Sequence, residues 1–307
     1  MTKQGSILVI RGGAIGDFIL TLPAIAALRR QFPAANLEIL GYPHIAQLAL
    51  AGGLVNALRP IEAQALAGFF ARGGELAEGL VDYFSDFDLI ISYLYDPDAI
   101  FQDNVARCTP AQFIVGPHRA LDAQGDHATK VYLKPLERLA IFDPDPIPRL
   151  SFVPAERRVS EPESSSPLAL HPGSGSERKN WPEAKWAELL ARLIEISSMS
   201  LLLVGGEAEG DRLSRLAAGL PSDRVRVAQS LALSDLGRRL ARCRGFVGHD
   251  SGISHLAAAV GLRTLVMWGE TALQVWRPPS DNVVVIQHPD GLEHLPVETV
   301  VEQIGRL

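Results

Sequence analysis

Cysteine is scarce in this chain, which carries only Cys108 and Cys243. The two lie far apart and without the spacing of metal ligands, so a disulfide scaffold is excluded and a reducing compartment is favoured. No apolar run reaches the roughly 18 residues of a membrane span. The chain leads directly into a strand at residues 6–10 rather than into a signal peptide. We therefore expect a cytoplasmic protein.

Neither sign of charge dominates. The chain has 29 Lys and Arg residues and 35 Asp and Glu residues, and a net charge of −6 argues against a broad electrostatic grip on nucleic acid. Its 307 residues, 47% hydrophobic and 21% charged, are enough for two domains, each with its own core. We expect a soluble globular protein.

Short apolar stretches alternate with helical patterns along the first half. We expect strands at residues 6–10, 36–41, 55–60, 87–92 and 112–115. Helical patterns lie between or after them, at residues 18–31, 66–84 and 128–142. Such alternation is typical of a parallel sheet with helices on both faces.

Composition changes sharply at residues 154–167, which are polar, charged and rich in Ser and Pro. Such a segment is typical of a linker between domains. We predict an N-terminal domain over residues 1–155, a linker over 156–166 and a C-terminal domain over 167–307. The terminal helix, at residues 296–304, either stays on the second domain or packs back on the first.

An aspartate follows the first predicted strand. The loop from Arg11 to Asp17, RGGAIGD, turns into the helix expected at residues 18–31. It is not a dinucleotide fingerprint, because Arg11 stands where G-x-G-x-x-G needs its first glycine. The helix dipole would keep Asp17 ionised, so that it could accept a proton from a substrate hydroxyl. The alternative is an N-cap aspartate.

The loop after the first strand of the second half has the composition of an anion site. Residues 172–180, PGSGSERKN, lead into a helix that opens at about Glu183. Backbone N–H groups, serine hydroxyls and the charges of Arg178 and Lys179 are the groups that a diphosphate needs. The spacing is not that of a Walker loop. The alternative is an exposed loop with solvated charges.

Residues 245–269, GFVGHDSGISHLAAAVGLRTLVMWG, indicate a strand, a tight turn, a helix and a second strand. The turn at Asp250, Ser251 and Gly252 would leave the first N–H groups of the helix facing an anion such as a phosphate. The alternative is that Asp250 or Ser251 only caps the helix and that His255 is a half-buried packing residue.

Carboxylates elsewhere allow two further hypotheses. Glu207 and Glu209 open a helix, where one of them could accept hydrogen bonds from a ribose or could only complement the helix dipole. Three Asp-x-Asp triplets have a spacing that suits Mg²⁺, but local strand and turn roles explain them sufficiently, so we expect no metal site. They lie at residues 86–88, 96–98 and 143–145.

Four segments together resemble glycosyltransferase family 9, the bacterial lipopolysaccharide heptosyltransferases. They are, in order, ILVIRGGAIGDFILTLPAIAALRRQFP, LHPGSGSERKNWPEAKW, LLVGGEAEGDRL and GHDSGISHLAAAVG. The resemblance covers most of the chain. It implies an α/β protein of GT-B architecture, with two Rossmann-like domains whose parallel sheets face across a cleft. It also implies inverting transfer with neither a metal nor another cofactor.

The resemblance also implies roles for single residues. Asp17 matches the aspartate proposed as catalytic base in the family. Lys179 matches the lysine that meets the donor phosphates, Ser174 or Ser176 the hydroxyl residues of that loop, and Glu209 the ribose-binding glutamate. The family signature Asp-[Ser/Thr]-Gly-x-x-His, around the diphosphate and the sugar, falls on Asp250, Ser251, Gly252, Ile253 and His255.

The function implied is transfer of a sugar, heptose from ADP-heptose, to a lipopolysaccharide-core or related glycolipid or glycan acceptor. No nucleic acid takes part, and contact with the inner face of the inner membrane is at most peripheral. The chain departs from the family at Glu270, where Gly-Pro-Thr has become Gly-Glu-Thr, and at a short end without the Cys-containing segment of many members. These departures leave open an alternative, a non-catalytic nucleotide-sugar-binding protein on the same fold.

Overall fold

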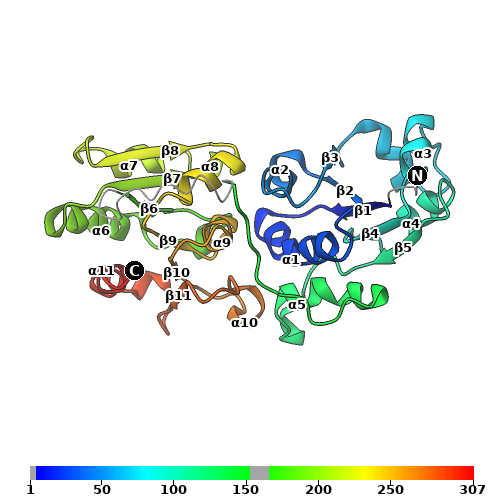
Figure 1. The fold of residues 1–307 in the computed structure, drawn as a ribbon. Coiled ribbons are helices and arrows are strands. Elements are labelled where there is room, and N and C mark those ends of the chain that lie inside the picture. The colour runs from blue at the N-terminus through cyan, green and yellow to red at the C-terminus, as the bar shows by residue number, and fades with distance from the viewer. Residues whose placement is uncertain (1–4, 153–165) are drawn as a thin grey trace. The chain divides into compact units, whose positions relative to one another are not determined.

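The computed structural model of the chain describes residues 5–152 and 166–307. The chain is divided into two compact units, Met1–Pro146 and Ile147–Leu307. Each unit is a parallel sheet packed with helices (Figure 1). Of the linker predicted at 156–166, all but residue 166 lies outside the described residues, so its bounds stay a prediction.

The first unit has five parallel strands in the order β3-β2-β1-β4-β5. They are β1 (Ser6–Arg11), β2 (Asn36–Gly41), β3 (Ala57–Pro60), β4 (Leu89–Ser92) and β5 (Gln112–Val115). β1 is central, and its residues 7–10 are apolar and buried, as is typical of a parallel strand covered by helices on both faces. The strand order reverses between β1 and β4, and α/β sheets bind ligands beyond the carboxyl ends of the strands at such a switch point.

The helices of the first unit connect these strands. They are α1 (Ile15–Gln31), α2 (Pro43–Ala51), η1 (Gln64–Phe70), α3 (Glu78–Ser85), α4 (Ile100–Ala106), η2 (Asp122–Gln124), α5 (Ala128–Leu133) and η3 (Lys134–Leu139). Each of the two longer helices predicted after α1 is broken. Residues 66–84 split into η1 and α3 around Gly73, whose φ of 63° does not occur in a helix. Residues 128–142 split at Pro135, which lacks the N–H that an α-helix would use there.

The second unit has six parallel strands in the order β11-β10-β9-β6-β7-β8. They are β6 (Leu168–Leu170), β7 (Leu201–Gly205), β8 (Val225–Gln229), β9 (Gly245–His249), β10 (Thr264–Met267) and β11 (Val283–Ile286). The order reverses between β6 and β9. The loops after these two strands are the two anion-binding loops predicted from the sequence.

The second core forms around α6. The helices of this unit are η5 (Glu177–Lys179), α6 (Glu183–Ile196), η6 (Glu207–Glu209), α7 (Arg212–Ala217), α8 (Leu233–Leu240), α9 (Gly252–Ala259), α10 (Leu273–Trp276), η7 (Leu292–His294) and α11 (Val297–Ile304). Trp186, Leu189, Leu190 and Leu193 recur at helical spacing and bury one face of α6. The terminal helix α11 packs against α6 within the second unit.

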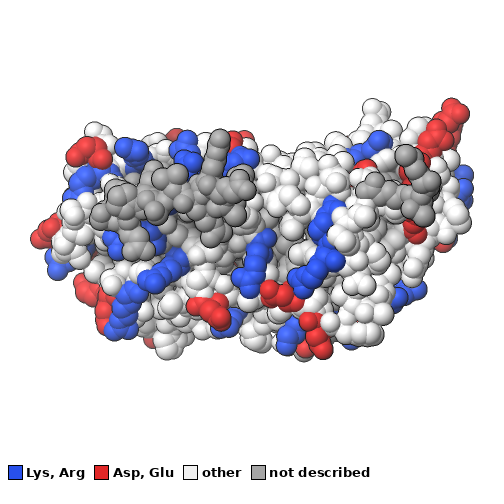
Figure 2. Space-filling model, in the orientation of Figure 1, with Lys and Arg blue, Asp and Glu red and all other residues white. Residues whose placement is uncertain are grey.

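The surface of the described residues carries both signs of charge. Figure 2 shows basic and acidic side chains mixed over the face in view. In the parts of the chain that the structure describes, no helix combines the length and the hydropathy that crossing a membrane requires.

Candidate active site

A lysine and an aspartate meet at the switch point of the second sheet. Lys179 comes from the loop after β6 and Asp250 from the loop after β9, and these loops lie at one edge because β6 and β9 are neighbours. Nζ of Lys179 lies 2.5 Å from Oδ2 of Asp250. The side chain of Asp250 is 8% exposed and that of Lys179 is 34% exposed. The pair is therefore partly open to solvent on the lysine side.

Thr271, which the sequence analysis assigned no role, completes this contact. Its hydroxyl donates to the same Oδ2 of Asp250 at 2.6 Å. The indole N–H of Trp268 donates to the carbonyl of Thr271 at 2.8 Å and so fixes the loop after β10. Position alone is the signal that could have found Thr271, because it follows the strand next to β9. Glu270, beside it, is exposed.

The turn after β9 starts α9 as predicted. Ser251 is the N-cap, and its side chain accepts a hydrogen bond from the N–H of Ser254 at 3.4 Å. Ser251 therefore caps the helix, while Asp250 is an ion-pair partner of Lys179. Gly252 and Ile253 are partly exposed at the first turn of the helix, where N–H groups are available to an anion. His255 is buried.

The loop after β6 is folded by its own side chains. The hydroxyl of Ser174 donates to the carbonyl of Ser176 at 2.7 Å and accepts from its N–H at 3.2 Å. The guanidinium of Arg212, on α7, donates to the carbonyl of Pro172 at 3.2 Å and to both carboxylate oxygens of Glu177 at 3.0 Å. These contacts order the backbone on which Lys179 stands.

Glu209 is the inward member of the glutamate pair. It is buried while Glu207 is exposed, and its Oε2 accepts the N–H of Gly206 at 2.5 Å. A Cβ at position 173 would overlap with the Glu209 carboxyl group, so only glycine allows this approach. The glutamate expected at a ribose therefore lies beside the loop that carries Lys179.

Two buried histidines support the same edge of the sheet. Nε2 of His249 accepts the N–H of Trp181 at 2.9 Å, and Nδ1 of His249 donates to the carbonyl of Gly173 at 3.1 Å. His171 donates from Nδ1 to the carbonyl of Val204 at 2.8 Å. Burial lowers the pKa of both imidazoles, that of His249 to about 3. Both side chains are therefore neutral at ordinary pH.

Asp17 lies in the first turn of α1, beyond the carboxyl end of β1. The N-cap of α1 is Ala14, so the N-cap alternative for Asp17 is wrong. Oδ1 of Asp17 accepts a hydrogen bond from the phenol of Tyr132 at 3.3 Å, and Nη2 of Arg11 lies 3.9 Å from the same oxygen. The aspartate side chain is 28% exposed. A carboxylate held in this way has one side open to solvent.

Arg11 and Tyr132 form the support of Asp17, and the sequence analysis missed both roles. The Arg11 side chain is buried, donates to the carbonyl of His118 at 2.7 Å and lies 4.6 Å from the centre of the Tyr132 ring. The phenol of Tyr93 donates to the carbonyl of Tyr132 at 2.7 Å. An arginine at the end of an apolar strand was the available signal for Arg11, whereas nothing local marks Tyr132.

The Asp-x-Asp triplets have structural partners. Oδ2 of Asp88 accepts the N–H of Ser6 at 2.9 Å, and Asp96 accepts the N–H groups of Phe101 and Gln102 at 3.2 and 3.0 Å. Asp88 and Asp96 therefore have structural hydrogen-bond partners, one on β1 and the other at the start of α4. Over residues 5–152 and 166–307, no three His, Cys, Asp or Glu side chains are grouped as metal ligands.

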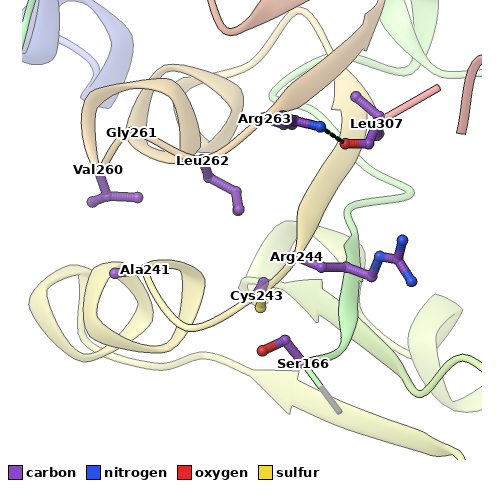
Figure 3. Close-up of a pocket in the computed structure, with 9 residues that line it drawn as sticks. All are labelled: Ser166, Ala241, Cys243, Arg244, Val260, Gly261, Leu262, Arg263 and Leu307. Atoms are coloured by element: carbon purple, nitrogen blue, oxygen red, sulfur yellow. Dashed lines mark hydrogen bonds between the residues drawn. The ribbon is translucent and has the colours of Figure 1, made fainter. Parts of the chain in front are cut away.

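A cavity of about 320 Å³ lies at the other edge of the second sheet (Figure 3). Arg244 and Arg263, which line it, precede β9 and β10, so the cavity is at the amino ends of the strands. Arg263 donates to the carbonyl of Leu307 at 2.5 Å. Parallel α/β sheets bind ligands at the carboxyl ends, and we therefore assign the candidate site to the loops after β6, β7, β9 and β10.

Comparison with known proteins agrees with this geometry. The sequence model of glycosyltransferase family 9 (heptosyltransferase) matches residues 118–299. Lipopolysaccharide heptosyltransferase 1 of Pseudomonas aeruginosa is 42% identical over 93 residues, which cover 30% of this chain but only 26% of that protein. Lipopolysaccharide heptosyltransferase 3 of Escherichia coli is 23% identical over 291 residues, 88% of this chain and 85% of that protein.

The solved heptosyltransferase WaaC of E. coli has a similar fold. Its complexes with ADP and with ADP-2-deoxy-2-fluoro heptose give TM-scores of 0.75 and 0.74 at 20% and 21% identity. In both, the match covers 98% of this chain and 99% of the other. At such identities the likeness establishes the fold, and the predicted GT-B class, with two parallel-sheet α/β domains, is confirmed.

Proposed function

This chain belongs to glycosyltransferase family 9, and from that premise we propose that it transfers heptose from ADP-heptose to a lipopolysaccharide-core or related glycan acceptor. The observation that carries the proposal is the pair of Lys179 and Asp250 at the switch point of the second sheet. The names of the relatives and the ADP and ADP-2-deoxy-2-fluoro heptose bound to the E. coli protein support the choice of donor.

The second unit holds the donor in this proposal. The ammonium of Lys179 and the N–H groups at the start of α9, near Ser251 and Gly252, meet the diphosphate. Negative charge grows on the diphosphate as the bond to the sugar breaks, so these groups stabilise the transition state more than the ground state. Glu209 accepts hydrogen bonds from the ribose. The donor is surrounded by further residues of the loop after β6 and of α9, namely Ser174, Ser176, Ile253 and His255.

The first unit supplies the base. Asp17 takes the proton of the acceptor hydroxyl, whose oxygen attacks the anomeric carbon from the side opposite to the diphosphate. The bond from carbon to the phosphate oxygen breaks, ADP leaves with the electron pair, and the configuration inverts. Among the described residues, the contacts of the carboxylate with Tyr132 and Arg11 both fall on Oδ1, so we assign Oδ2 as the proton acceptor.

We also propose that the transfer needs no metal ion. The positive charge of Lys179, and that of Arg178 next to it, takes the part of a divalent cation at the leaving group. We further propose that the enzyme acts on a glycolipid acceptor with at most peripheral contact at the cytoplasmic face of the inner membrane.

Glu270 favours a second candidate, a nucleotide-sugar-binding protein without turnover. This exposed residue precedes Thr271, whose hydroxyl contacts Asp250, so it adds a negative charge near a site for a diphosphate. This candidate predicts binding of the donor without transfer to any acceptor.

Two measurements on the purified chain test the proposal. In a thermal-shift screen of ADP, UDP and GDP, we expect ADP to raise the melting temperature most, since a ligand at about 100 times its Kd adds roughly 2.7 kcal/mol of stability. Incubation of ADP-heptose with a lipopolysaccharide-core acceptor should then release ADP. Binding without release would favour the second candidate, and no binding of any nucleotide would overturn both.

A further inference from the structure

One histidine holds both ends of the loop that carries Lys179. His249 is the last residue of β9, directly before Asp250. Its imidazole donates to the carbonyl of Gly173, near the start of the loop, and accepts the N–H of Trp181, at its end. Two bonds from one ring thus span the whole loop.

A third contact, near the end of the loop, attaches it to the residue that follows His249. Lys179 pairs with Asp250, the residue after His249, at 2.5 Å. The loop therefore crosses the end of β9 with three points of attachment, at Gly173, Lys179 and Trp181. Rotation or displacement of the imidazole would change the position of the lysine relative to the helix start at Ser251.

The imidazole itself is fixed from all sides. It is fully buried, and its ring packs edge-on against Trp186 with centres 5.4 Å apart. The backbone of His249 is held as well, because its carbonyl accepts the hydroxyl of Ser254 at 2.5 Å. Because a carbonyl can only accept, Nδ1 carries the proton and Nε2 is the acceptor, which is the neutral form. Burial lowers the pKa of this imidazole to about 3, although the hydrogen bond to Gly173 and the nearby carboxylate of Asp250 act to raise it.

We propose that His249 is a positioning residue for transfer: by holding Gly173 and Trp181 it sets the loop that aims Lys179 at the diphosphate of the donor. The inference rests on the proposed function, because the position of Lys179 affects transfer only if the lysine binds the diphosphate of the donor. It assigns no chemical step to the imidazole, which neither gains nor loses a proton.

Substitutions can remove the two bonds one at a time. His249→Asn keeps a donor near the position of Nδ1 and loses the acceptor for Trp181. His249→Gln keeps an acceptor near Nε2 and loses the donor for Gly173. His249→Phe loses both. Thr264→Val is the matched control, because it removes a buried hydroxyl that donates to Leu262 at 2.8 Å at the amino end of β10, away from the loop.

We expect kcat/KM for ADP-heptose to fall about tenfold in each of the Asn and Gln variants and further in the Phe variant, in line with one hydrogen bond each. The KM for the acceptor should stay unchanged, and Thr264→Val should lower the melting temperature without changing either constant. In a Lys179→Ala background, His249→Asn should have little further effect, because the residue acts through the lysine.

The outcomes distinguish failure of the positioning role of His249 from failure of the proposed function. If Lys179→Ala weakens ADP binding while His249→Asn and His249→Gln leave donor kcat/KM at the wild-type value, the positioning role is overturned and the proposed function stands. Additive losses from His249 and Lys179 would also overturn the role. If Lys179→Ala leaves ADP binding and turnover unchanged, the proposed donor site fails, and the positioning role fails with it.

Discussion

The ammonium of Lys179 and the carboxylate of Asp250 form an ion pair of 2.5 Å at the carboxyl edge of the second sheet. Asp250 is nearly buried, and a buried charge is stable only with a partner. The lysine therefore has two roles, since it balances Asp250 and presents positive charge toward the surface. Thr271 is the one further donor that the described contacts give to this carboxylate.

Replacement of Lys179 by Ala should lower donor kcat/KM by about two to three decades, the usual loss for one oriented group at a developing charge. It should also lower the melting temperature, because Asp250 loses its ion-pair partner. Arg226→Ala, at an exposed position of β8 in the same unit, is the control and should change neither value appreciably. Steady-state kinetics and thermal unfolding measure both effects. Unchanged ADP affinity in Lys179→Ala would contradict the assignment.

Replacement of Asp17 by Asn should reduce transfer by about 100-fold or more, the usual contribution of a general base, and leave the Kd for ADP unchanged. An amide can still accept the hydrogen bond of Tyr132 but cannot take the proton. Tyr132→Phe should give a smaller loss, about tenfold, because the carboxylate is less well held. Tyr95→Phe, at an exposed tyrosine of the same unit, is the control. Turnover retained in Asp17→Asn would remove the aspartate from the role of base.

Two glycines of one loop give a matched test of Glu209. In Gly173→Ala the new methyl group would overlap with the Glu209 carboxyl group, whereas Gly175→Ala meets nothing within 4 Å. We expect the first variant to raise the Kd for ADP about tenfold or more through loss of the hydrogen bonds to ribose, and the second to behave as wild type. Calorimetric titration with ADP measures both. Equal affinities in the two variants would argue against a ribose contact by Glu209.

Much of the fold could be predicted from local sequence. The strands at 36–41 and 112–115 and the start of α6 at Glu183 agree with the structure, because apolar runs bounded by turn residues have few alternatives in a parallel sheet. The prediction of two long helices, at residues 66–84 and 128–142, was wrong, because Gly73 and Pro135 break them.

The site could be predicted only in part. The loops after β1, β6 and β9 were found because glycine, serine and charged residues follow apolar strands there. The residues that contact these loops were not found. Tyr132 and Asp17 are 115 residues apart and Trp181 and His249 are 68 residues apart, and such contacts depend on the order of the strands in the sheet. No local sequence pattern indicates the order of the strands in a sheet.

His249 should also make the stability of the protein depend on pH. Burial holds its pKa at about 3, below the ordinary value of 6.5, so between these values the unfolded chain binds a proton that the folded chain does not. The stabilisation is present in full above about pH 6.5 and is lost as the pH falls toward about 3. Within that window the free energy of unfolding should fall by up to about 1.4 kcal/mol for each pH unit.

The comparison that isolates this contribution is the difference between wild type and His249→Asn. Carboxylates remote from position 249 titrate alike in both proteins and cancel. The free energy of unfolding, from urea titrations at about pH 7, 6 and 5, should fall more steeply in the wild type, since Asn takes up no proton in either state. Parallel curves would mean that His249 takes up a proton as readily in the folded protein as in the unfolded chain, and Nε2 of that protonated form could not accept the N–H of Trp181.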